Sequence, residues 1–229
     1  MSLTTVLSIS RIPSKARAHE GLVRRIAERA NEKRDAYQWR TYQVVAGDPG
    51  MIHFVSEAAD FAGLAKRDLT AQSLVLRLFG ESEGAKLLDE LAACGSAARF
   101  VIGRDRPDLS YPPDARDAPM SVVTVLRVRP GHQDAAEELI RKLAEAIPKV
   151  DDPARLITYQ SVIGDLRTLW TVRPIASLAD LDRQLAPNDL LNKAFGSGEG
   201  GLIGRAGMEA LESVERSILM LRADLSNPR

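Results

Sequence analysis

The chain has 229 residues, of which 45% are hydrophobic and 27% are charged, a composition typical of a globular protein large enough to bury a core. Its 31 basic and 31 acidic residues give a formal net charge of zero, which argues against nucleic acid or an anionic membrane surface as a partner. A single cysteine, Cys94, excludes an intrachain disulfide framework, and no signal-peptide pattern or membrane-length apolar run is visible, so we expect a cytoplasmic protein without a membrane span.

The predicted elements come in two copies, because the sequence contains an internal repeat. At an offset of 117 residues Thr41-Tyr42-Gln43 matches Thr158-Tyr159-Gln160, and after the loss of one residue Phe79-Gly80 matches Phe195-Gly196. The match ends at Ser110 and Ser226, and the segment between the copies is short and rich in proline. We therefore predict two domains, residues 1–110 and 120–229, joined by a linker at 111–119.

Each copy begins with a predicted strand, a helix and a hairpin. Residues 5–11 and 122–128 are short β-branched segments that end at a proline, as strands leaving a sheet do. Apolar residues at a spacing of three to four then predict a helix over 18–30 and 135–147. The segments 39–46 with 51–55, and 156–163 with 168–172, predict a hairpin around the Gly-Asp turns at 47–48 and 164–165.

The remainder of each copy is predicted to be helical until a last strand. The expected helices are 58–69, 73–79 and 83–94 in copy one, and 178–185, 190–195 and 202–213 in copy two, and the expected strands are 99–103 and 216–221. This order predicts an α+β protein whose copies are ferredoxin-like, each a four-stranded antiparallel sheet with helices on one face. We expect the two uncovered faces to pack against each other, giving a barrel-like pseudo-dimer within one chain.

The second copy also resembles a known family. The sequence Val-Thr-Val-Leu-Arg-Val-Arg-Pro-Gly at 123–131, followed by a periodic helix and a hairpin, resembles the dimeric α/β-barrel superfamily, especially its antibiotic-biosynthesis-monooxygenase-like branch. Copy one has Arg-Ile-Pro-Ser at 11–14 and lacks the glycine. The resemblance implies the barrel fold, in a superfamily that includes cofactor-independent oxygenases of aromatic polyketides, lactone isomerases, haem-degrading enzymes and haem-dependent chlorite dismutase-like proteins. The Asn, Trp and His of the haem-degrading branch cannot all be placed here, which argues against haem degradation.

Four residues on the predicted hairpins are candidates for substrate binding. His53 and Trp170 occupy equivalent positions on the third strand of each copy, and Tyr42 and Tyr159 are equivalent on the second. An imidazole can exchange a proton, while Trp and Tyr rings can stack on an aromatic molecule. The alternative interpretation is structural, with all four side chains filling the core or the contact between the two sheets.

Two other patterns are not taken as sites. The segment 196–201 fits the G-x-G-x-x-G pattern, but no parallel strand precedes it, so we expect a mobile loop or a plain helix-to-helix connection. His19, His53 and His132 have no carboxylates at metal-ligand spacing, so we predict no metal, and we expect Cys94 to be an inert buried thiol.

The functional hypothesis is that the protein binds a small hydrophobic or aromatic molecule in the apolar space between each sheet and its helices, or between the two sheets. If it is an enzyme, we expect a cofactor-independent monooxygenase or isomerase. We expect no cofactor. The alternative is a non-enzymatic ligand-binding or protein-interaction module, and a haem-binding barrel is retained as a third hypothesis. The sequence leaves open a further homo-oligomer of such chains.

Overall fold

The computed structural model describes residues 2–65, 71–112 and 118–228 of an α+β protein. Its antiparallel strands are hydrogen-bonded in the order β1-β3-β2-β8-β5-β7-β6-β4, which closes into a barrel. The chain forms two compact units. Unit 1 contains Met1–Gly103 and Met220–Arg229, and unit 2 contains Arg104–Leu219.

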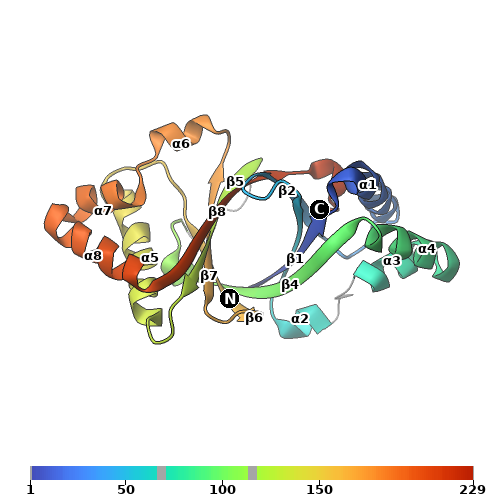
Figure 1. The fold of residues 1–229 in the computed structure, drawn as a ribbon, viewed down its shortest axis with the longest axis horizontal. Helices are drawn as coiled ribbons and strands as arrows, with labels where there is room; N and C mark the ends of the chain where they lie inside the picture. The colour runs from blue at the N-terminus through green and yellow to red at the C-terminus, as the bar shows by residue number, and fades with distance from the viewer. Residues whose placement is uncertain (1, 66–70, 113–117, 229) are drawn as a thin grey trace. The chain divides into compact units, whose positions relative to one another are not determined.

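In unit 1 a sheet is covered on one side by helices (Figure 1). The elements are β1 (Leu3–Arg11), α1 (Ala16–Glu32), β2 (Arg40–Ala46), β3 (Met51–Ala58), α2 (Phe61–Ala65), α3 (Ala71–Phe79), α4 (Glu81–Ala92) and β4 (Gly95–Asp105). Strand β3 pairs with both β1 and β2. Helix α1 buries His19, Val23, Ile26, Ala27 and Ala30, the three-to-four spacing that its sequence predicts.

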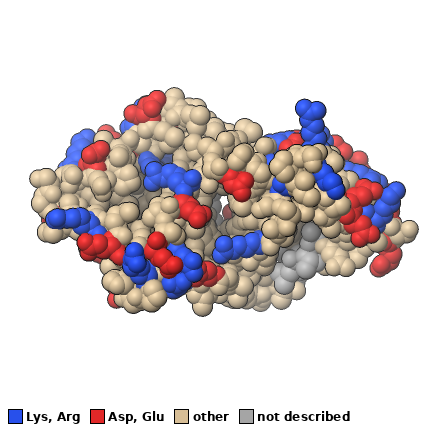
Figure 2. Space-filling view, in the orientation of Figure 1, with Lys and Arg blue, Asp and Glu red and all other residues tan. Residues whose placement is uncertain are grey.

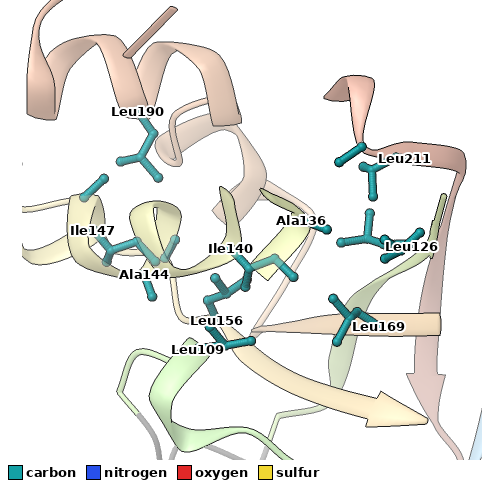
Figure 3. Close-up of a cluster of buried hydrophobic side chains, with 14 residues drawn as sticks. Leu109, Leu126, Ala136, Ile140, Ala144, Ile147, Leu156, Leu169, Leu190 and Leu211 are labelled. Atoms are coloured by element: carbon teal, nitrogen blue, oxygen red, sulfur yellow. The ribbon is translucent and has the colours of Figure 1, made fainter. Parts of the chain in front are cut away.

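Unit 2 repeats this arrangement. Its elements are β5 (Met120–Val128), α5 (Gln133–Lys149), β6 (Ile157–Ile163), β7 (Thr168–Ile175), α6 (Ala179–Arg183), α7 (Pro187–Phe195), α8 (Ser197–Glu209) and β8 (Leu211–Leu221). Strand β7 pairs with both β5 and β6. Between the sheet and the helices lies a continuous apolar core, in which Leu126, Ile140 and Leu169 are at most 7% exposed (Figure 3).

Each sequence copy ends in a short segment that docks on a strand of the other copy. In unit 2 the Thr158 hydroxyl donates to the carbonyl of Leu109 at 2.7 Å, and the Thr158 amide donates to Ser110 Oγ at 2.9 Å. In unit 1 Thr41 makes the same two bonds, to the Leu225 carbonyl at 2.6 Å and to Ser226 Oγ at 2.9 Å. The structural units therefore exchange the ends of the sequence copies, and this explains why the repeat extends to the two serines.

Each of these terminal segments of the copies begins with an arginine, Arg106 or Arg222, whose hydrogen bonds fix its position. Arg106 donates to Asp108, to Glu137 Oε2 at 2.7 Å and to Gln160 Oε1 at 2.9 Å. Arg222 donates in the same way to Asp224 and to Gln43 Oε1 at 2.8 Å. Charge-assisted bonds of this kind fix the segments to the neighbouring strand and helix.

The strand, helix and hairpin predicted at the start of each copy are confirmed, but the bounds of several later elements need correction. The helix expected over 58–69 is wrong at its start, because Ala58 ends β3 and the helix is Phe61–Ala65; residues 66–69 lie outside the described residues. The last strands begin four or five residues earlier than expected, at Gly95 and Leu211. Of the predicted linker, residues 113–117 lie outside the described residues, and Tyr111 forms a bridge with Leu156.

The glycine-rich segment 196–201 is not a loop, because α8 begins at Ser197. A Cβ atom on Gly200 would lie 2.7 Å from the backbone carbonyl carbon of Leu191 on α7, closer than real side chains approach. Glycine is therefore needed here so that two helix backbones can touch, and this packing offsets the low helix propensity of the segment.

Candidate functional site

Unit 1 contains a cavity of about 450 Å³ between its sheet and its helices. Apolar side chains from β1, α1, β3, α3, α4, β4 and the segment before β2 form most of its wall: Leu7, Ile9, Val23, Ile26, Trp39, Phe54, Leu74, Val75, Leu88, Leu91 and Phe100. The volume is within the range of about 300–1,000 Å³ that small-molecule sites occupy.

The repeat explains why this space is open in unit 1. Gly95 borders the cavity, and its equivalent in copy two is Leu211, which is 5% exposed and belongs to the unit 2 core. Figure 3 shows Leu211 beside Leu126 in that core. A Cβ atom on Gly95 would meet nothing closer than Ile9 Cγ2 at 3.4 Å, so the position has room for a side chain. The same place in the fold is thus filled by leucine in one unit and empty in the other.

The helix that covers the sheet is also set differently in the two units. Leu91 of α4 lines the cavity, whereas its equivalent in α8 is Gly207. A Cβ atom on Gly207 would lie 2.6 Å from the Leu139 side chain of α5, so α8 and α5 are in direct contact. Leucine on α4 and glycine on α8 therefore give a lined space in unit 1 and a close-packed interface in unit 2.

The cavity wall has one buried polar group without a partner. None of its described lining residues is Lys, Arg, Asp or Glu. His19 of α1 is 3% exposed, and its Nδ1 has no hydrogen-bond partner in the described part of the chain. By contrast, Trp39 Nε1 donates to the Leu225 carbonyl at 2.9 Å, and the Thr5 hydroxyl lies 2.7 Å from Ser56 Oγ. Among the fully buried polar atoms of the described lining residues, His19 Nδ1 is therefore the one that lacks a partner.

The imidazole of His19 is neutral at neutral pH. Burial lowers its pKa from 6.5 to about 4, because a buried cation loses its hydration, and nearby Arg11 lowers the pKa further while Glu20 opposes the shift. Arg11 and Glu20 form an ion pair of 3.0 Å between themselves. The neutral ring is a hydrogen-bonding group and not a counter-charge for an anion.

The four predicted site residues form two cross-strand pairs, one in each unit. Tyr42 is opposite His53, and Tyr159 is opposite Trp170, with ring centroids 5.7 Å apart and nearly parallel planes. The structure thus brings together the predicted residues of each copy. Phe54 lines the cavity, and neighbouring strand residues point to opposite faces, so His53 lies on the other face of the sheet. None of the four is a lining residue, and their role in substrate binding stays a prediction.

His53 has a hydrogen-bond partner of its own. Its Nδ1 lies 2.9 Å from Ser8 Oγ on β1. Burial lowers the pKa of His53 to about 4, and Asp48 opposes that shift. This histidine is therefore satisfied within its sheet, unlike His19.

The sequence pointed to a space between sheet and helices but not to the copy that holds it, and it singled out His19 only as a possible metal ligand. The signal available was the comparison of the copies: the equivalent of His19 is Ala136, a small apolar residue on the buried face of α5. A histidine among the apolar positions of one helix, together with glycine in place of Leu211, marks the difference between the copies.

Other features bear on the predicted absences. In the described ranges, no three His, Cys, Asp or Glu side chains are grouped so as to hold a metal ion. Among the described helices, none combines the length and the apolar character of a membrane span. Cys94 is free and buried. Figure 2 shows basic and acidic side chains interspersed on the face drawn, in agreement with the zero net charge.

Comparisons with known proteins show the fold. No protein-family model and no curated protein matches the sequence. Among solved structures, an anthrone oxidase-like protein is 15% identical with a TM-score of 0.59, over 100% of this chain and 94% of the other. A candidate monooxygenase from Lactobacillus acidophilus NCFM is 6% identical with a TM-score of 0.57, over 99% and 97%. A variant chlorite dismutase from Candidatus Nitrospira defluvii, in complex with cyanide, is 9% identical with a TM-score of 0.57, over 98% and 92%.

These similarities extend over nearly the whole of each chain. The protein is an α+β barrel with the dimeric α/β-barrel (ferredoxin-like) fold, as the sequence resemblance predicted. At such identities the likeness concerns the fold alone.

Proposed function

We propose that this protein binds a small, neutral, hydrophobic or aromatic molecule in the cavity of unit 1, and that the role of unit 2 is structural. The observation that carries the proposal is the difference at one position of the repeat. Gly95 borders a cavity of about 450 Å³, while the equivalent Leu211 is buried in a packed core. An unfilled apolar space costs stability, so its presence in unit 1, where unit 2 has a buried leucine at the equivalent position, favours a role in binding.

The wall also favours a class of ligand. Burial of apolar surface stabilises a complex by about 25 cal/mol per Å², and the wall is mostly apolar. The rings of Trp39, Phe54 and Phe100 offer faces and edges to an aromatic ligand. Because the described lining residues carry no charge, an anion or a cation would lose its hydration without compensation.

Equilibrium dialysis with 2-naphthol tests this proposal. The variant Gly95→Leu introduces the copy-two residue into the cavity, and Gly21→Ala is the control, because a Cβ atom on Gly21 meets nothing within 4 Å. We expect saturable binding to the natural chain and to Gly21→Ala, and loss of binding in Gly95→Leu. Native mass spectrometry of freshly purified protein would reveal a retained ligand. Equal binding by all three proteins, or none by the natural chain, would contradict the proposal.

A second candidate function is catalysis without a cofactor, by oxidation or isomerisation. Such chemistry needs a base beside the bound molecule, and the cavity wall offers the neutral imidazole of His19. The test is anthrone, which consumes one O₂ and gives anthraquinone and water. Oxygen uptake that exceeds the protein-free rate and disappears in Gly95→Leu would support an enzyme. An unchanged rate favours the binding module, and a Soret absorbance of the purified protein would instead favour the haem hypothesis.

We also propose that the two repeats pair as a pseudo-dimer. The matching hydrogen bonds that Thr41 and Thr158 make with the ends of the opposite copies support this arrangement. Light scattering of the purified chain distinguishes a monomeric pseudo-dimer from a further homo-oligomer.

A further inference from the structure

The unpaired Nδ1 atom of His19 is unusual for a buried polar group. Most such atoms in proteins have a hydrogen-bond partner, because burial without one forfeits the bond that water would supply. Here the atom is buried and has no partner in the described part of the chain, and the imidazole that carries it lines a cavity. A partner of suitable chemistry could come from a bound molecule.

The surroundings of His19 narrow that chemistry. Arg11 and Glu20 are the charged groups near the ring, and they are paired with each other. The described lining residues contain no carboxylate to balance an ammonium group and no cation to balance a carboxylate. The partner is therefore an uncharged group. A neutral imidazole has one N–H donor and one acceptor nitrogen, and a hydroxyl group can meet either, since it both donates and accepts.

We infer that His19 is a specificity-determining residue whose imidazole hydrogen-bonds the hydroxyl group of a bound neutral phenol or alcohol. This inference rests on the proposed binding function and adds the polar group by which the ligand is selected. The second copy has Ala136 at the equivalent position, which offers no such bond. The selection thus belongs to unit 1.

The test compares two probes that differ by one hydroxyl group, 2-naphthol and naphthalene, in equilibrium dialysis at pH 7. The quantity measured is the ratio of the naphthalene Kd to the 2-naphthol Kd, which cancels differences in probe hydration when proteins are compared. We expect this ratio to fall about tenfold from the natural chain to His19→Phe, the value of one neutral hydrogen bond. Naphthalene itself should bind both proteins within about twofold, because His19→Phe keeps a ring in the wall.

Two further variants complete the design. His132→Phe is the matched control, because His132 is an exposed histidine of unit 2, and it should leave the ratio unchanged. His19→Gln restores a group that donates and accepts, and should recover part of the ratio. If His19→Phe fails to fold, judged by circular dichroism, His19→Ala replaces it, since alanine is the natural residue of copy two at this position.

An unchanged ratio in folded His19→Phe, with naphthalene still bound, would overturn the role of His19 and leave the cavity as a binding site. Failure of both probes to bind the natural chain would instead overturn the proposed function.

Discussion

The substitution Gly95→Leu links stability to ligand binding and has a magnitude that follows from the structure. A leucine at position 95 would occupy, in unit 1, the space equivalent to the one that Leu211 fills in unit 2. The nearest atom to its Cβ is Ile9 Cγ2 at 3.4 Å, an ordinary contact. Full burial of a leucine side chain contributes about 1.5–3 kcal/mol. Loss of glycine from a strand adds about 0.5–1 kcal/mol. We expect a net stabilisation of about 2–3 kcal/mol, since the cavity also borders exposed residues of β4.

Urea denaturation followed by circular dichroism measures this change. For a chain of 150–250 residues, 1 kcal/mol corresponds to about 2–4 °C in Tm, so thermal unfolding should shift upward by about 4–12 °C. The reciprocal variant Leu211→Gly removes a side chain that is 5% exposed and should destabilise the protein by about 3–5 kcal/mol. The reasoning is refuted if Gly95→Leu is less stable than the natural chain, or if it is more stable but still binds 2-naphthol with unchanged affinity.

Three further predictions concern acid, helix packing and cooperativity. The His19 pKa is about 4 when folded and 6.5 when unfolded, so the unfolded chain alone takes up that proton between these values. Stability should therefore fall by about 3 kcal/mol from pH 6.5 to pH 4, and His19→Phe should remove this part of the loss in urea titrations. Gly200→Ala should lower Tm, because its Cβ would lie 2.7 Å from the Leu191 backbone, whereas Gly201→Ala, with open space around it, should raise Tm slightly. Tyr42→Ala should destabilise the whole protein in one calorimetric transition, and two separated transitions with the second half unaffected would contradict the proposed pairing of the two repeats.

The fold was largely predictable because the same order of strands and helices is encoded twice in the sequence, once in each copy. Apolar spacing in α1 and α5, and the Gly-Asp turns of both hairpins, are local features that the sequence displays directly. The glycine-rich start of α8 was not predictable in this way, because its helix depends on contact with α7, which only the folded chain provides. Local propensity is a weak guide where a tertiary contact requires glycine.

The cavity was harder to predict than the fold. Alternation along β3 separates His53 from Phe54, but the sequence does not tell which face borders an empty space. The size of a cavity depends on the volumes of several side chains together. Here unit 1 has Gly95 and Leu91 where unit 2 has Leu211 and Gly207, and no single one of these residues predicts a cavity. The polar signal, His19, lay among apolar helix positions where a histidine usually finds a partner.

The exchanged ends of the two copies have a consequence for how the protein could diverge. The segment Arg222–Ser226 of copy two completes unit 1, and the segment Arg106–Ser110 of copy one completes unit 2. Each unit therefore contains the end of the other copy. Fragments produced by cutting the chain within 111–119 should depend on each other to fold. Covalent fusion makes that dependence intramolecular, at an effective concentration of order millimolar. In an assembly of two identical chains every substitution occurs twice. In the fused chain, one half can lose its cavity and become scaffold while the other keeps its site.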